Sequence, residues 1–252
     1  MKNILNKKLI ERYSRQLVLK DVGTTGQKII IKSKVLVVGA GGLGCPVIDY
    51  LSRAGVGNIG IIDDDKVNIS NIHRQSLYDT SDIDKFKVIV LKKKIKLINP
   101  LVKIKIFKER IGKKNIKKIF KNYDFIVDGS DNFKTKFLLN KYSLKYKKIL
   151  IVGAISKMDG HIFTFDFKNK NDPCLKCFYQ AEPSDEILNC EYEGILGPVA
   201  GIVGNIQAME VLKKILKIGN KSNKKILIID LLNLNFRKVK FNKKKNCICK
   251  KS

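Results

Sequence analysis

Closely spaced glycines after a short apolar run carry the first chemical signal in the sequence. Gly39, Gly41, Gly42 and Gly44 fit the pattern G-x-G-x-x-G, whose turn lets backbone N–H groups and a helix N-terminus approach a phosphate. Glycine also suits tight strand-to-helix turns for steric reasons alone. Asp63 follows about 20 residues later, the spacing of a carboxylate that accepts from a ribose hydroxyl. Together these residues predict nucleotide binding and leave a dinucleotide and ATP both open.

The polar residues that come next favour ATP. A hydride-transfer site needs one carboxylate at the ribose and an apolar nicotinamide pocket, whereas cations with a second acid suit a triphosphate and Mg²⁺. Taken singly, each of these residues fits a solvated loop. They follow successive strands of one predicted sheet, however, at the edge where such folds bind ligands, and so predict adenylyl transfer. The set is Asp63, Asp64, Asp65, Ser70, Asn71, Arg74, Lys87, Asp131 and Asn132.

Two close pairs of cysteines predict a structural metal site. Cys174 and Cys177 have the C-x-x-C spacing of a zinc clip, and Cys247 and Cys249 near the C-terminus complete a set of four thiolates. The alternative is two thiol pairs that hold no metal. A disulfide framework is not expected in an unexported protein. Cys45, in the segment after the glycine turn, is interpreted as a small packing residue.

The elements that position these residues begin with a strand, a turn, a helix and a strand. The β-branched run 35–38 leads into the glycines, apolar residues then recur at helical spacing, and the run 59–62 ends at Asp63. This is a βαβ unit. Further runs predict that a parallel sheet continues: a strand at 101–107, a helical face at 116–120, a strand at 125–127 and a strand at 149–152.

The second half of the chain has a different character. A strand at 162–167 pairs antiparallel, and His161 at its head is expected to face solvent. A cysteine-bearing loop at 172–193, a long helix at 198–216 and strands at 225–229 and 236–241 follow. We predict an α/β fold whose Rossmann-like βαβ nucleotide-binding half continues into a mixed sheet. It is predicted as one domain over 1–252, with a helical segment at 1–33.

Composition limits the class of protein. Of the 252 residues, 44% are hydrophobic and 29% charged, which excludes a disordered tail, a collagen and a fibre. No apolar stretch approaches the roughly 20 residues of a bilayer span, so we expect a cytoplasmic protein without a membrane partner. The formal charge of +28 suits a nucleic-acid binder, but only 6 of the 51 basic residues are arginine. We expect no nucleic-acid partner, and keep such a binder as an alternative with steeply salt-dependent affinity.

Motifs along nearly the whole chain carry a family resemblance. They are RYSRQ at 12–16, GAGGLG at 39–44, AGVGNIGIIDDD at 54–65, SNIHRQ at 70–75, NP at 99–100, DGSDN at 128–132, PCLKC at 173–177 and GPVAGIVGNIQAMEVLK at 197–213. With these motifs the chain resembles the E1-like activating enzymes of the ThiF, MoeB and HesA group. The resemblance implies an adenylyltransferase that uses ATP to adenylate the C-terminal glycine of a ubiquitin-like sulfur carrier protein and releases pyrophosphate.

The resemblance also implies roles for single residues. Gly42 and Asp63 would contact the nucleotide, with Asp63 at the ribose, and Asp131 would hold Mg²⁺ with Asn132 beside it. Arg15 would reach the phosphates bound by the other subunit of a homodimer. The attacking carboxylate is already ionised near neutral pH, so cations and metal are needed and a general base is not. The residues expected around the phosphates are Asn71, Arg74 and Lys87.

The cysteines depart from this family in one respect. Relatives typically end in a second C-x-x-C, whereas Cys247 and Cys249 form C-x-C, a tighter bite that still permits Zn²⁺. Cys190 lies in the loop ahead of the long helix. In ThiF-like relatives a cysteine at this place joins the carrier's C-terminus after adenylation, whereas in MoeB-like relatives the matching cysteine is dispensable. Both interpretations of Cys190 stay open.

The choice of carrier depends on finer detail. The acid run at 63–65 and the GPV at 197–199 resemble ThiF more than MoeB. A ThiF-like enzyme would activate ThiS for the thiazole of thiamine, and a MoeB-like enzyme would activate MoaD for molybdopterin, each with a sulfur-donor system as a further partner. An NAD-dependent oxidoreductase is the alternative from another class. It explains the glycines and Asp63 but leaves Arg74, Lys87 and Asp131 without a role.

Overall fold

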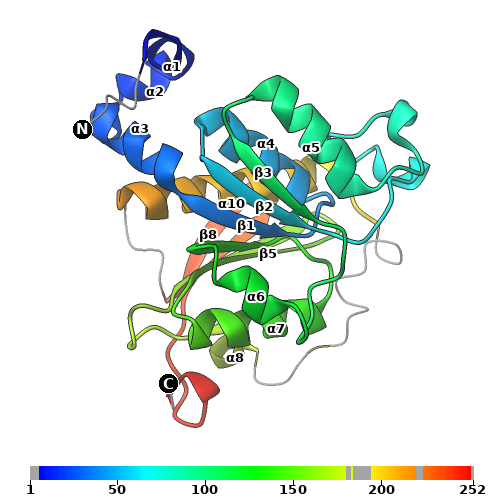
Figure 1. Ribbon diagram of the computed structural model, residues 1–252. Helices are drawn as coiled ribbons and strands as arrows, with labels where there is room; N and C mark the ends of the chain where they lie inside the picture. The colour runs from blue at the N-terminus through cyan, green and yellow to red at the C-terminus, as the bar shows by residue number, and fades with distance from the viewer. Residues whose placement is uncertain (1–5, 180–182, 184–193, 220–223, 251–252) are drawn as a thin grey trace.

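One mixed sheet of eight strands runs through the protein in the order β3-β2-β1-β4-β5-β6-β7-β8. Strands β1 to β5 are parallel to one another, and β6, β7 and β8 each run antiparallel to their neighbours. The computed structural model describes residues 6–179, 183, 194–219 and 224–250 (Figure 1). The strands are β1 Lys34–Val38, β2 Asn58–Ile62, β3 Lys103–Phe107, β4 Phe125–Asp128, β5 Ile149–Ser156, β6 Asp159–Asp166, β7 Lys225–Asp230 and β8 Asn235–Lys240.

Helices cover both faces of this sheet (Figure 1). Helices α4, α5 and α10 lie on one face, where α10 packs against α4 and β5, and α6, α7 and α8 lie on the other. This layering is the usual way to bury both faces of a parallel sheet. The helices are α1 Lys7–Arg12, α2 Ser14–Leu17, α3 Gly23–Lys32, α4 Gly44–Ala54, α5 Lys87–Ile98, α6 Ile116–Phe120, α7 Phe133–Lys145, α8 Leu175–Phe178 and α10 Gly197–Leu216.

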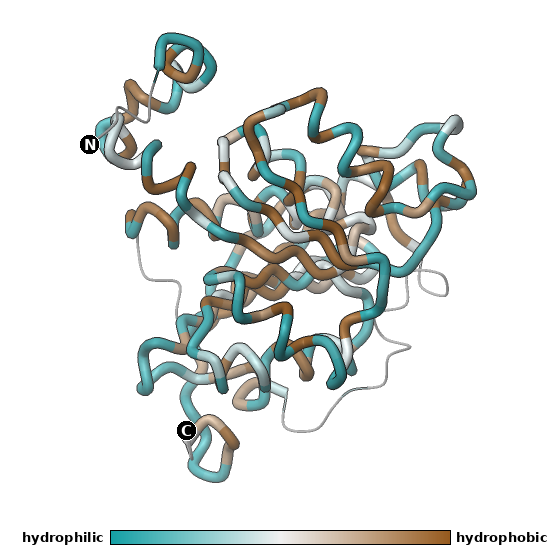
Figure 2. Tube along the Cα trace, viewed as in Figure 1, coloured by the Kyte–Doolittle hydropathy of each residue, from teal (hydrophilic) through white to brown (hydrophobic). Residues whose placement is uncertain are grey.

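The alternation of side chains along β1 explains why its sequence is apolar at nearly every position. Val35 and Val37 belong to the core beneath α4 and α10, while Leu36 and Val38 belong to the core on the opposite face. Successive residues of a strand point to opposite faces, so a strand covered on both sides needs apolar residues at consecutive positions. In Figure 2 the central strands are correspondingly hydrophobic. The carboxyl ends of β1, β2 and β4 are thereby fixed next to one another.

The predicted fold class is confirmed: one α/β domain carries a parallel half that continues into a mixed sheet. Helices α5 and α7 were not among the predicted elements. The expectation that His161 faces solvent is wrong, because the side chain is half-buried on β6 between β5 and β7. Burial lowers the pKa of His161 below its ordinary value.

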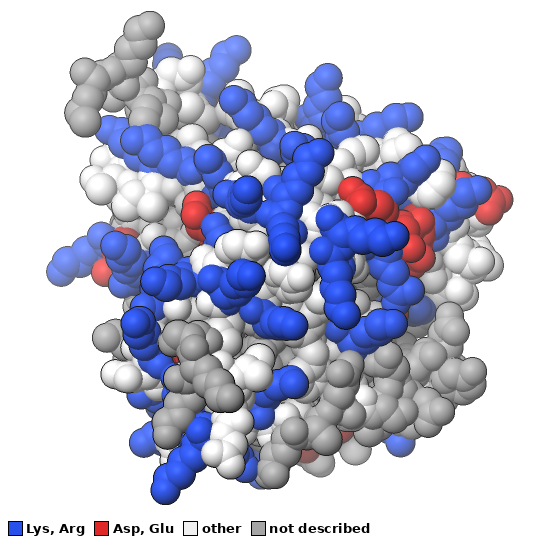
Figure 3. Space-filling model, turned by 60° about the horizontal axis from the view of Figure 1, so that its bottom comes forward, with Lys and Arg blue, Asp and Glu red and all other residues white. Residues whose placement is uncertain are grey.

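Basic side chains are distributed widely over the surface. In Figure 3 they cover much of the visible face, and several acidic side chains gather at one side of it. Exposed lysines on α5 and β3 alternate with residues that face the core. Among the described residues, every helix is too short or too polar to span a bilayer.

Candidate active site

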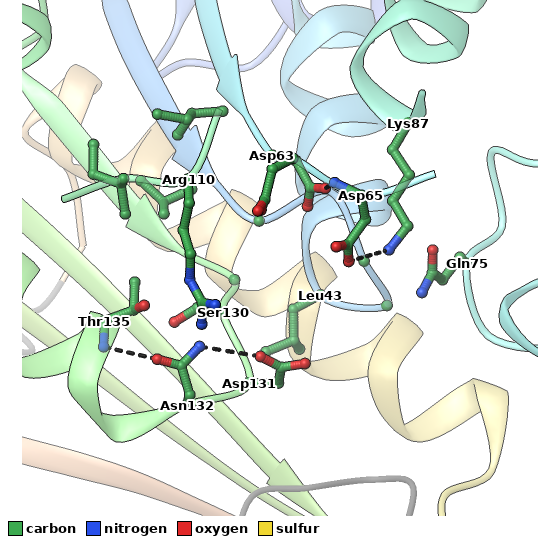
Figure 4. A pocket seen from close by; sticks show the side chains of 18 of the residues that line it. Leu43, Asp63, Asp65, Gln75, Lys87, Arg110, Ser130, Asp131, Asn132 and Thr135 are labelled. Carbon is green, nitrogen blue, oxygen red and sulfur yellow. Dashed lines mark hydrogen bonds and ion pairs between the residues drawn. The ribbon is translucent and has the colours of Figure 1, made fainter. Parts of the chain in front are cut away.

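A cavity of about 310 Å³ opens at the carboxyl ends of β1, β2 and β4 (Figure 4). Three loops, one after each of these strands, meet there and supply most of its polar lining. The edge of the parallel sheet is where folds of this kind bind ligands. Of the residues predicted from the sequence, the cavity brings together Gly39, Gly41, Gly42, Asp63, Asp64, Asp65, Arg74, Lys87, Asp131 and Asn132.

The turn after β1 requires glycine at two positions, Gly39 and Gly44, because a Cβ at either would clash with the backbone. Gly39 has φ +90°, and a Cβ there would lie 2.7 Å from the carbonyl oxygen of Gly129. A Cβ at Gly44 would lie 2.0 Å from the carbonyl oxygen of Gly39. Gly41 differs, because its Cβ would meet only Gln75 Nε2 at 3.6 Å. The fold itself therefore admits a side chain at position 41, and glycine there leaves the floor of the cavity open to a ligand.

Asp63 is held in place by backbone amides from two loops. Its Oδ2 accepts from Ala40 N at 2.7 Å, and its Oδ1 accepts from Asp65 N at 2.8 Å. Burial raises the pKa of the Asp63 carboxyl, while the nearby Lys87 and both N–H donors lower it. The carboxylate is therefore fixed at the end of β2 with acceptor capacity left for a ribose hydroxyl.

Lys87 brings a buried cation to the same cavity. It is the first residue of α5, its side chain is 7% exposed, and its Nζ lies 3.0 Å from Asp65 Oδ2. The backbone oxygen of Asp65 also accepts from the amide of Lys87 at 3.0 Å. Asp65 thus links Asp63 to the start of α5, and its own carboxylate, 65% exposed, holds the ammonium group at the cavity.

Arg74 is the second cation of the cavity, and the two predicted residues before it have another role. Arg74 Nη1 donates to the carbonyl oxygen of Ser70 at 2.8 Å. Asn71 Oδ1 accepts from Asn68 N at 3.2 Å and closes a short 3₁₀ turn at Ile69–Asn71. Ser70 and Asn71 do not line the cavity. They build the turn that fixes Arg74, and their predicted contact with a nucleotide stays a prediction.

The turn after β4 presents the carboxylate predicted to hold magnesium. Asn132 is the N-cap of α7, where its Oδ1 accepts from Thr135 N at 2.8 Å and its Nδ2 donates to Asp131 Oδ1 at 3.2 Å. No described residue forms an ion pair with Asp131. Carboxylate oxygens facing an aqueous cavity are the ligands that Mg²⁺ takes together with phosphates, so this donor set fits the cofactor.

A buried ion pair beneath this turn was missed by sequence reasoning. Lys136 is 1% exposed, and its Nζ donates to Asp128 Oδ2 at 3.2 Å, to Ser130 O at 2.7 Å and to Gly153 O at 2.6 Å. The pair ties the turn to β5. A usable signal was Asp128 itself, because a carboxylate at the end of a buried strand needs a buried partner.

Gln75 and Arg110 also line the cavity; Gln75 ends the SNIHRQ motif at 70–75 without a role of its own assigned to it, and Arg110 was not predicted. Gln75 is 4% exposed, and its Oε1 accepts no hydrogen bond from the described residues. It directly follows the predicted Arg74. Arg110 comes after β3 and is one of few arginines in a lysine-rich chain, which was the signal available for it.

The two predicted cysteine pairs come together. The Sγ atoms of Cys174, Cys177, Cys247 and Cys249 all lie within 4.8 Å of one another, and the Cys174–Cys247 and Cys177–Cys249 pairs are 3.4 Å apart. A tetrahedral zinc site with Zn–S bonds of about 2.3 Å separates its sulfurs by about 3.8 Å. The four buried thiols therefore fit Zn²⁺ in composition and spacing.

The remaining predicted residues lie elsewhere. Arg15 is exposed on α2 and does not line the cavity of its own chain. Gly44 begins α4, next to the cavity but not in its lining. Cys45 is buried among core residues, where burial raises its pKa to about 12. Cys190 lies outside the described residues.

The sequence is similar to a known protein family and to several of its members. The model of the ThiF family matches residues 13–251. A sulfur carrier protein adenylyltransferase of Thermus thermophilus is 37% identical over 245 residues, which are 96% of this chain and 90% of that protein. A probable molybdopterin-synthase adenylyltransferase of Gracilaria tenuistipitata is 37% identical over 236 residues, which are 94% of this chain and 66% of that protein. The chain thus spans nearly all of the first relative and just under two thirds of the second.

A solved structure supports the same architecture. A crystal structure of E. coli MccB with ATP aligns with a TM-score of 0.82 at 21% identity and covers 96% of this chain and 75% of that one. At this level of identity the likeness concerns the fold. It supports the assignment of this chain to one α/β domain.

Proposed function

Because the chain belongs to the ThiF family, we propose that it is an adenylyltransferase that activates the C-terminal glycine of a ubiquitin-like sulfur carrier protein with ATP. The observation that carries the proposal is the single cavity in which Arg74 and Lys87 face Asp63 and Asp131 around a glycine turn. A nicotinamide-dependent oxidoreductase would have no use for the two cations or for Asp131. The composition of the cavity therefore favours a triphosphate.

The reaction joins two anions. An oxygen of the carrier's carboxylate forms a bond to the α-phosphorus of ATP, and the bond from that phosphorus to the oxygen bridging the β-phosphorus breaks. Pyrophosphate leaves with the electron pair, and an acyl adenylate remains. The terminal carboxyl has an ordinary pKa of roughly 3.3–3.7, so it attacks as an anion without a general base. The barrier is lowered by positive charge placed where negative charge develops.

The residues of the cavity divide this work. Asp63 accepts from the ribose, which sets the position of the nucleotide along the sheet edge. Lys87 and Arg74 bind the phosphates, and their fixed side chains need little reorganisation as charge develops. Asp131, oriented by Asn132, would hold Mg²⁺, which supplies further positive charge to the phosphate oxygens when it is bound.

Exchange of labelled pyrophosphate into ATP tests the assignment. We propose ThiS, of thiamine synthesis, as the carrier, with MoaD, of molybdopterin synthesis, as the alternative. The purified protein is expected to catalyse exchange only when a carrier ending in Gly-Gly is added, and more efficiently with ThiS. A carrier whose last glycine is deleted is the control, because it retains its surface but misplaces the carboxylate. Exchange with neither carrier would overturn the proposal, and exchange with MoaD alone would assign the alternative pathway.

We further propose a homodimer in which Arg15 reaches the nucleotide bound by the other chain. Arg15 is exposed beside Gln16, which lines a second, more apolar hollow of about 490 Å³. Tyr50 and Met209 line the same hollow and are 52% and 56% exposed. Large exposed apolar side chains around a hollow are typical of an interface. This surface would bring the two Arg15-bearing segments together.

Mixing two inactive variants tests the exchange of Arg15 between subunits. Arg15→Ala and Lys87→Ala are each expected to be nearly inactive alone. Random dimers of the two would restore about a quarter of the sites, because half of the dimers are mixed and each of these has one intact site. A protein that sediments as a monomer, or a mixture that stays inactive, would refute the proposal.

We also propose that the four clustered cysteines hold one structural Zn²⁺. The ion would tie the C-terminal segment at Cys247 and Cys249 to the start of α8 at Cys174 and Cys177. Such sites contribute directly to the free energy of folding. We expect close to one zinc per chain by metal analysis. A chelator should lower the melting temperature, and added zinc but not magnesium should restore it. A zinc content near zero with unchanged melting would contradict this.

A further inference from the structure

We propose that the guanidinium of Arg110 stacks on the base of the bound nucleotide, so that Arg110 is a base-binding residue. The inference rests on the proposed function, because it presumes that a nucleotide binds in the cavity at the carboxyl ends of β1, β2 and β4. Three observations support it: the way in which the backbone aims Arg110, its place relative to Asp63 and Lys87, and the apolar surfaces around it.

The chain after β3 is fixed by one asparagine. Asn115 Oδ1 accepts from Gly112 N at 2.8 Å, and Asn115 Nδ2 donates to Arg110 O at 2.8 Å and to Glu109 Oε2 at 2.7 Å. Ile111 is 7% exposed and packs into the core next to α6. Glu109, Arg110 and Ile111 all line the cavity. The Glu109 carboxylate is engaged by Asn115 and Ile111 packs in the core, so Arg110 is the residue of this segment whose side chain extends into the cavity without such a contact.

The position of Arg110 along the cavity separates a base from phosphates. In Figure 4, Arg110 extends toward Ser130 and Asn132, on the other side of Asp63 from Lys87. If Asp63 holds the ribose and Lys87 the phosphates, the base attached to the opposite side of the ribose points toward Arg110. The geometry thus gives Lys87 and Arg110 different partners: a phosphate for Lys87 and an uncharged ring for Arg110.

The chemistry at this end of the cavity suits a flat ring. Val38, Ile62, Ile111 and Ala154 are all buried and line the cavity with apolar surface. No described residue forms a hydrogen bond or ion pair with the Arg110 guanidinium. A planar guanidinium above an apolar floor binds an aromatic ring by stacking and by cation–π attraction, and bases have such a face whatever their substituents.

Calorimetric titration with AMP, ATP and inorganic tripolyphosphate tests the inference on the full chain. Arg110→Ala should lower the affinity for AMP and the affinity for ATP by the same factor, about 3- to 30-fold, as expected from the loss of a cation–π contact. The affinity for tripolyphosphate should not change. Arg110→Lys retains the charge but lacks the plane, so it should lose most of the same affinity. Lys108→Ala removes one charge from an exposed neighbour that lies over the ring of Phe86, and should bind all three ligands as the unaltered protein does.

The outcomes separate this inference from the proposed function. If Arg110→Ala bound ATP with unchanged affinity, the stacking role would be overturned. A loss of affinity at least about tenfold larger for ATP than for AMP would also overturn it, and would assign Arg110 to a phosphate. Failure of the unaltered protein to bind ATP would overturn the adenylyltransferase assignment and the inference with it. Because Arg110 is exposed, its variants are expected to melt at the temperature of the unaltered protein, which a thermal scan checks.

Discussion

Replacing Lys87 with alanine is expected to slow carrier-dependent ATP–pyrophosphate exchange by about 10²- to 10³-fold, the effect of removing one preorganised donor worth roughly 2 to 4 kcal/mol. Its ammonium group is buried at the cavity, fixed by Asp65 at 3.0 Å. After the substitution the nearby carboxylates remain and repel the phosphates. A water molecule in place of the ammonium group does not supply the positive charge that offset this repulsion. Initial rates of exchange at saturating ATP and carrier measure the effect.

The matched control is Lys92→Ala. Lys92 lies on the same helix as Lys87 but is exposed, so its replacement changes the net charge equally without touching the cavity. Its exchange rate should stay within about twofold of the unaltered protein, since surface substitutions have small effects. Equal rates for Lys87→Ala and Lys92→Ala would contradict the phosphate-binding role of Lys87 even though the cavity exists.

Replacing Lys136 with methionine is expected to lower the free energy of unfolding by about 3–5 kcal/mol, the effect of leaving one member of a buried ion pair alone. Asp128 is fully buried and Lys136 is 1% exposed. The variant also removes the donors to Ser130 O and Gly153 O. Urea denaturation followed by circular dichroism gives the difference in free energy.

The same variant predicts a pH dependence. Burial raises the pKa of Asp128 and Lys136 opposes that rise, so in Lys136→Met the folded protein binds a proton at higher pH than the unfolded chain. The unfolded carboxyl has a pKa of about 3.9. The variant should therefore be least stable relative to the unaltered protein at neutral pH, and the difference should shrink as the pH falls toward about 4.

Two further variants separate the buried charge from the loss of a side chain. Adding Asp128→Asn to Lys136→Met removes the unpaired carboxylate and should recover part of the stability. Lys134→Met changes an exposed lysine of the same helix and should alter the free energy by less than about 0.5 kcal/mol. If Lys136→Met were no less stable than Lys134→Met, the ion pair would not hold the turn after β4.

Much of the site was predictable because its residues lie where strands end. Asp63 follows β2 directly, the glycines follow β1, and Asp131 follows β4 by a short turn. Strand positions were readable from apolar runs, and a parallel sheet brings its carboxyl ends to one edge. The four cysteines were predictable for a different reason, since close pairs in a chain without a disulfide framework point to metal.

The residues that sequence reasoning missed depend on tertiary contacts. Lys136 is one lysine among many, and only the packing of α7 against β4 and β5 shows that it is buried. Arg110 needed the turn held by Asn115 before its direction could be known. Ser70 is a different case, because the structure adds a role that the motif did not indicate: its carbonyl oxygen accepts from Arg74 Nη1, while its predicted contact with a nucleotide stays a prediction.

The lysines on the two outer strands of the sheet bear on whether chains associate through these strands in concentrated solution. Within the part of the chain that the structure describes, β3 pairs with β2 alone and β8 with β7 alone, so each has one edge whose main-chain groups are not paired with another described strand. Lys103 and Lys105 are exposed on β3, and β8 is exposed along its whole length with Lys238 and Lys240 among its residues. Like charges at both borders repel a second chain that would otherwise add there by strand pairing. We therefore expect the lysines on these two strands to protect the protein from edge-to-edge aggregation, independently of the ligand that the cavity binds.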